Sequence, residues 1–129
     1  MANYIATARS NYFRVKDSAA FQMWCEERRL SCWQKEDHWA IQPKDHSGWP
    51  NVTATTDEEF DLLEELHGHL QEECVAILLE VGSERTRYLC GYANAVRGGK
   101  DFELLHLSLD DIYAQAEEAW GKDLTHATY

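Results

Sequence analysis

Histidine and cysteine are the residue types in this sequence that could bind a metal or act as a nucleophile. The histidines stand at 38, 46, 67, 69, 106 and 126, and the cysteines at 25, 32, 74 and 90. His67 and His69 are two residues apart and therefore point to different faces of a helix, and no C-x-x-C or H-E-x-x-H motif occurs. Each cysteine lies in an apolar stretch, which raises a thiol pKa and lowers reactivity. We predict no metal, no cofactor and no enzymatic activity.

Carboxylates that follow Thr56 form the most distinctive charged pattern. Thr56 with Glu59 three residues later is typical of a capping box, which predicts a helix over residues 56–71. On a helix, side chains at i and i+3 or i+4 lie about 5–6 Å apart, comparable to neighbouring phosphates on a nucleic-acid strand. A row of carboxylates that imitates phosphates would comprise Asp57, Glu58, Asp61, Glu64 and Glu65, with Glu72, Glu73 and Glu80 as an extension. The alternative is a solvated helix face, whose first-turn acids suit the helix dipole.

Trp49 is the best candidate for an apolar anchor in a partner interface. It lies in the sequence SGWP, in a predicted loop over residues 44–55. Tryptophan is enriched among residues that dominate binding energy. The alternative is that Trp49 packs against the core of its own chain.

Charge narrows the classes of partner. The 129 residues carry a formal net charge of −11, and seven basic and six acidic residues in 1–50 give that segment +1. Residues 51–129 hold five basic and 17 acidic residues, a net charge of −12. This excludes direct nucleic-acid binding and an anionic membrane surface, and it favours a basic protein as partner. The longest apolar run, residues 75–79, is too short for a bilayer, and the N-terminus lacks the apolar core of a signal peptide, so we expect a cytoplasmic protein with reduced thiols.

The predicted helices and strands indicate an α+β fold. Strands are predicted over residues 11–16, 74–81, 85–96 and 102–107, a hairpin over 31–42, and helices over 19–29, 56–71 and 108–120, with Gly82 and Ser83 as a turn. The order β-α-β-β-α-β-β-β-α implies a mostly antiparallel sheet with helices packed on one face, as a single domain of residues 1–129. Gly91 within a strand suggests a bulge or close packing. The final helix would present an apolar face of Ile112, Ala116, Ala119 and Trp120.

A longer pattern resembles a family of small acidic proteins carried on bacterial plasmids, integrative elements and phages. In words, the pattern is NYFxVKD, a GWP loop, an acidic helix, ExGxExxRYLxGYAxAV and a C-terminal helix with IY. The matching residues are Asn11, Tyr12, Phe13, Val15, Asp17, Gly48, Trp49, Pro50, Glu80, Gly82, Glu84, Arg87, Tyr88, Gly91, Tyr92, Ile112 and Tyr113.

The resemblance implies a setting in which small acidic proteins inhibit host defence. By analogy, we expect a non-enzymatic inhibitor of the anti-CRISPR kind, which blocks a positively charged DNA or RNA channel of a CRISPR effector or restriction-type enzyme. The alternative is a protein-binding accessory or regulatory factor of a mobile element that does not mimic DNA.

Overall fold

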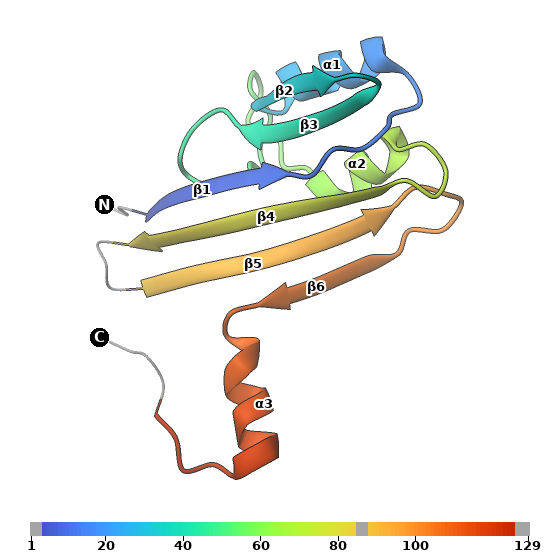
Figure 1. Ribbon diagram of the computed structural model, residues 1–129. Coiled ribbons are helices and arrows are strands. Elements are labelled where there is room, and N and C mark those ends of the chain that lie inside the picture. The colour runs from blue at the N-terminus through green and yellow to red at the C-terminus, as the bar shows by residue number, and fades with distance from the viewer. Residues whose placement is uncertain (1–3, 85–87, 126–129) are drawn as a thin grey trace.

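The computed structural model (Figure 1) describes residues 4–84 and 88–125 and has the α+β order expected from the sequence. Strands β1, β4, β5 and β6 form one antiparallel sheet in the spatial order β1-β4-β5-β6, and β2 pairs with β3 in a separate hairpin. The elements are β1 (Tyr4–Ser10), α1 (Ser18–Glu27), β2 (Leu30–Lys35), β3 (His38–Pro43), α2 (Leu62–His69), β4 (Val75–Glu84), β5 (Tyr88–Arg97), β6 (Leu104–Ser108) and α3 (Asp111–Trp120). No helix in the described part of the chain has the length and apolar character needed to span a bilayer.

Helix α1 and the hairpin follow the sequence prediction closely. The Asp17 side chain caps α1 by accepting a hydrogen bond from the Ala20 amide at 3.1 Å. Phe21, Trp24 and Cys25 bury one face of this helix, which packs on β2. These local signals were sufficient because capping and apolar spacing agree here with the tertiary contacts.

The predicted strand over residues 11–16 is wrong, because the first strand is β1, immediately before it. Phe13 and Val15 are buried as predicted by the alternation, but they make only isolated bridges, to Trp39 and Leu70. This segment lies between the hairpin and α2, so its alternation reflects burial between two elements rather than pairing in the sheet.

The predicted turn at Gly82 and Ser83 is also wrong, because β4 continues through both residues to Glu84. A Cβ on Gly82 would lie 2.7 Å from the Ile5 carbonyl oxygen, so glycine permits close approach of β1. Residues 85–87, the start of the predicted strand over 85–96, lie outside the described residues. The close packing predicted at Gly91 is confirmed, since a Cβ there would lie 2.7 Å from Leu109 Cδ1.

The core lies on one face of the sheet, which we call the inner face. Ala76, Leu78 and Val96 point from the sheet into a cluster with α1, α2 and the hairpin. The opposite, outer face carries exposed side chains such as Leu79 and Leu105. Helix α3 extends beyond β6 (Figure 1), and none of its residues is buried.

Candidate functional site

The predicted acidic helix is shorter than its sequence suggested. Helix α2 begins at Leu62, and its N-cap is Asp61, whose side chain accepts a hydrogen bond from the Glu64 amide at 3.2 Å. Thr56 does not act as the cap, because its hydroxyl is hydrogen-bonded to Thr53 Oγ1 at 2.8 Å. Asp57 has a left-handed φ of 52°, so it turns the chain before the helix. Asp57 and Glu58 therefore lie in a loop, and the predicted row of five helical carboxylates does not form.

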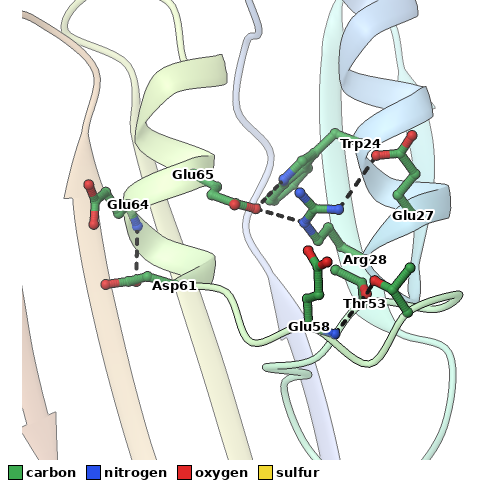
Figure 2. A network of polar contacts seen from close by, with 9 residues as sticks. Trp24, Glu27, Arg28, Thr53, Glu58, Asp61, Glu64 and Glu65 are labelled. Carbon is green, nitrogen blue, oxygen red and sulfur yellow. Dashed lines mark hydrogen bonds and ion pairs between the residues drawn. The ribbon is translucent and has the colours of Figure 1, made fainter.

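Two of the predicted partner-binding carboxylates are paired within the chain. Asp57 accepts from Arg29 Nη2 at 2.8 Å. Glu65 Oε1 accepts from Arg28 Nε at 2.8 Å and from Trp24 Nε1 at 2.9 Å, so it links α2 to α1 (Figure 2). Burial raises the pKa of Glu65, but these two hydrogen bonds outweigh it and hold the pKa below its ordinary value. Glu65 is therefore a charged link between helices.

Asp61 and Glu64 retain carboxylates that face away from α1, as Figure 2 shows. Neither forms an ion pair with any described residue. Glu58 lies on the other side, towards Arg28, and also has no ion pair among those residues (Figure 2). Glu72 lies apart, in a hollow shared with Arg97 and Lys100, where opposite charges are mixed.

Asp61 borders an apolar groove of about 370 Å³ between the SGWP loop, α2 and the inner face of the sheet. Trp49, Phe60, Leu63 and Leu78 are among the residues of its apolar walls. Its full lining is Trp49, Pro50, Asn51, Phe60, Asp61, Leu62, Leu63, Leu78, Tyr92 and Asn94. Two of the predicted site residues, Trp49 and Asp61, thus meet in one concave feature, the typical form of a binding site.

Trp49 is partly buried and packs against the core of its own chain, the alternative to a projecting anchor, and it also lines the groove. Its indole Nε1 is buried without a hydrogen-bond partner among the described residues. The side chain is therefore a fixed wall of the groove and not a freely projecting anchor.

A buried carboxylate, Glu80, holds the SGWP loop in place. Glu80 is 4% exposed, and its two oxygens accept from the Trp49 amide at 2.8 Å and from the Tyr4 hydroxyl at 2.6 Å. Burial and the bond to Glu80 raise the pKa of Tyr4, and burial followed by Glu80 also raises that of Tyr92. Gly48 has a φ of 95°, and a Cβ there would lie 2.6 Å from Glu80 Oε1. Glu80 is therefore buried and does not extend an acidic surface. The prediction that it extends the row of carboxylates is wrong.

Residues from two distant segments of the chain surround the carboxylate of Glu80. Gly48 and Trp49 reach it from the SGWP loop, and Tyr92 reaches it from β5. The role of Glu80 was missed from the sequence, although it has one local signal. A single acid within the apolar run AILLEV occupies the same strand face as the buried Ala76 and Leu78.

In the described ranges, no group of three or more His, Cys, Asp or Glu side chains is arranged to hold a metal ion. Comparisons of the chain with protein-family models, with curated proteins and with solved structures gave no match.

Proposed function

We propose that this protein is a non-enzymatic inhibitor that binds a basic, nucleic-acid-handling protein of a bacterial defence complex, most specifically a CRISPR effector. The binding site is the groove beside Trp49, with the carboxylate of Asp61 in its lining and that of Glu64 on the same side of α2. The observation that carries the proposal is an apolar groove bordered by Asp61, which, like the neighbouring Glu64, has no cationic partner among the described residues.

The charge distribution supports a basic partner. Residues 51–129 carry a net charge of −12, and opposed fields accelerate association with a Lys- and Arg-lined channel. Channels of this kind hold nucleic acid through its backbone, so an acidic protein competes for the same contacts. Fewer acids are available to a partner than the sequence predicted, because Asp57 and Glu65 are paired with arginines of the same chain.

A variant that neutralises Asp61 and reverses the charge of Glu64 tests the proposal. The variant carries Asp61→Asn, which keeps an N-cap residue, and Glu64→Lys. We expect the wild-type protein to block target-DNA binding by a susceptible CRISPR effector complex in a gel-shift assay. The variant should inhibit about tenfold less well.

A matched control carries Asp101→Asn and Glu118→Lys, which change the net charge equally at exposed sites outside the groove. It should inhibit like the wild type. Circular dichroism verifies that both variants fold. Equal inhibition by the groove variant and the wild type would refute the groove as the binding site.

A second function is favoured by the apolar lining of the groove. An accessory factor of a mobile element would bind its partner there mainly by apolar contact, without mimicry of nucleic acid. Salt separates the two proposals. Mimicry predicts a steep fall in affinity between about 50 and 200 mM salt, whereas an apolar interface predicts little change.

A further inference from the structure

The outer face of the sheet is apolar, and apart from Leu109, which lies over Gly91, we find no described segment packed on it. Side chains alternate between the two faces of a strand, and the strand register places every second residue of β1, β4, β5 and β6 on this face. Seven large apolar residues on it are at least 40% exposed. They are Ile5, Val75, Leu79, Val81, Leu89, Leu105 and Leu107.

This face has a shape that complements itself. Ala93 and Ala95 on β5 form the floor of an apolar hollow of about 250 Å³, bordered by Ile77 on one side and by Leu105 and Leu107 on the other. The two leucines, 73% and 61% exposed, stand as a ridge on β6 beside this hollow. A ridge and a hollow on the same surface are what a two-fold interface requires, since each copy supplies both.

Charge on this face also distinguishes it from the rest of the molecule. The protein has 23 acidic residues, yet the outer-face positions of the four strands hold no Asp or Glu. The charged residues at these positions are Arg9 and Arg97. Arg97 forms an ion pair at 3.7 Å with Glu103, which precedes β6. Two copies that each carry −11 can therefore approach through this face with little local repulsion.

We infer that the outer face binds a second copy of this chain, so that the protein is a symmetric dimer. The seven exposed side chains present on the order of 800 Å² of surface, close to what each partner buries in a standard interface. Monomeric proteins rarely leave more than a few hundred Å² of contiguous apolar surface exposed. The ridge of Leu105 and Leu107 enters the hollow over Ala93 and Ala95 of the second copy.

The dimer leaves the proposed groove accessible. The groove opens between the inner face and the SGWP loop, whereas the dimer contact uses the outer face. The two sites therefore lie on opposite faces of the sheet, and the dimer would present one groove on each side. The dimer does not depend on the proposed function, and different residues test it.

Sedimentation equilibrium on the full chain tests the dimer. We expect a mass twice that of the 14.9 kDa chain. Leu105→Glu and Leu107→Glu should each raise the dimer Kd by about 100-fold or more, because a carboxylate would replace a leucine that the apolar interface buries. Met23→Glu on α1 is the matched control, since Met23 is 66% exposed outside this face and its replacement should leave the dimer intact.

Ala95→Phe distinguishes a specific dimer interface from non-specific hydrophobic association. Phenylalanine adds apolar surface but fills the hollow, so a ridge-in-hollow interface is weakened, whereas non-specific association is strengthened. Circular dichroism verifies folding of each variant. A wild-type mass of one chain at about 100 μM would overturn the inference, because interfaces of this size have micromolar or tighter Kd. Dimers that persist in both glutamate variants, or that Ala95→Phe strengthens, would also overturn it.

Discussion

At the scale of single residues, Glu80 is the side chain on which the groove depends. It is an acid at the centre of a sheet, and it is stable there because both oxygens accept hydrogen bonds. Its contacts join β4 to the N-terminal strand through Tyr4 and to the SGWP loop through Trp49. Loss of this carboxylate therefore acts on the groove wall without removing any groove side chain.

The two neutral replacements of Glu80 should differ. Glu80→Gln is expected to be mild, because its amide oxygen accepts from the Trp49 amide while its nitrogen donates to the Tyr4 hydroxyl oxygen. Glu80→Leu removes the acceptor of the Trp49 amide and of the Tyr4 hydroxyl, and we expect it to lower the free energy of unfolding by about 1–3 kcal/mol more. Urea denaturation measures the difference. Glu84→Leu, on the same face but partly exposed, is the control, and the assignment fails if it costs as much as Glu80→Leu.

We expect His69 to make the stability of the fold depend on pH. It packs against Trp24 with ring centroids 5.0 Å apart, and burial lowers its pKa below the ordinary value of 6.5. The unfolded chain therefore binds a proton first as the pH falls. Stability should decline as the pH drops below about 6.5, until the folded pKa is passed.

His69→Phe keeps an aromatic ring but does not ionise, so it should remove this decline. Urea denaturation at pH values from 7.5 to about 5 measures the effect, which spans the ordinary histidine pKa. His46→Gln, a histidine replacement at an exposed position outside the core, is the matched control. An identical slope in His69→Phe and the wild type would contradict the assignment.

At the scale of elements, one charged contact joins the two short helices of the core. Arg28 follows α1, and Trp24 lies within it, while their shared acceptor Glu65 belongs to α2. The Arg28 guanidinium also lies over the Phe60 ring at 5.1 Å. Helix α2 has only eight residues, too few to be stable alone, so it depends on contacts of this kind.

Removal of the Glu65 charge should lower stability in one pH range only. The pKa of Glu65 is held below its ordinary value of 4.5, so its contribution is complete above that pH and is lost as the pH falls through the folded pKa. We expect Glu65→Gln to lower the free energy of unfolding by about 1 kcal/mol at pH 7, because the pair is partly exposed.

The difference between Glu65→Gln and the wild type should shrink as the pH falls below 4.5, which urea denaturation at a series of pH values measures. Glu64→Gln, one residue earlier on the same helix and without an ion pair among the described residues, is the control. It should change the free energy of unfolding little at pH 7. A cost at pH 7 that is equal in the two variants would refute the link.

At the scale of the whole molecule, the two faces of the sheet have opposite character. The inner side carries the core, the groove and the acidic residues Asp61 and Glu64. The outer side is apolar and lacks acids on its strands. The groove variant therefore tests inhibition and the ridge variants test dimerisation, each independently of the other. Inhibition can be lost while the dimer persists, and the dimer can be lost while inhibition persists.

Much of the fold was predictable because its signals are local. The Asp17 cap and the apolar face of α1 lie within a few residues of each other, and the hairpin follows from two β-prone segments around a polar turn. The buried Cys25 thiol, whose pKa is raised by burial and then by Cys32, also follows from its apolar neighbours. The other three cysteines are only partly buried, which neighbouring residues did not reveal.

The site was less predictable because distant contacts decide it. Asp57 and Glu65 read as free acids in the sequence, since no lysine or arginine lies between Lys44 and Arg85. Arg29 and Arg28, from the end of α1, nevertheless reach them. Helix α2 starts later than predicted for a similar reason. The Thr53 hydroxyl is hydrogen-bonded to the Thr56 hydroxyl and accepts from the Glu58 amide, so these two groups do not form the predicted helix cap.

The sequence by itself determined the order of elements, the surplus of acid in residues 51–129 and the alternation that gives each strand an apolar side. The pairing of the acids, the burial of Glu80 and the exposure of one apolar face follow from tertiary contacts. Spacing along the chain fixes the face on which a side chain lies. What covers that face depends on segments that meet only when the whole chain has folded.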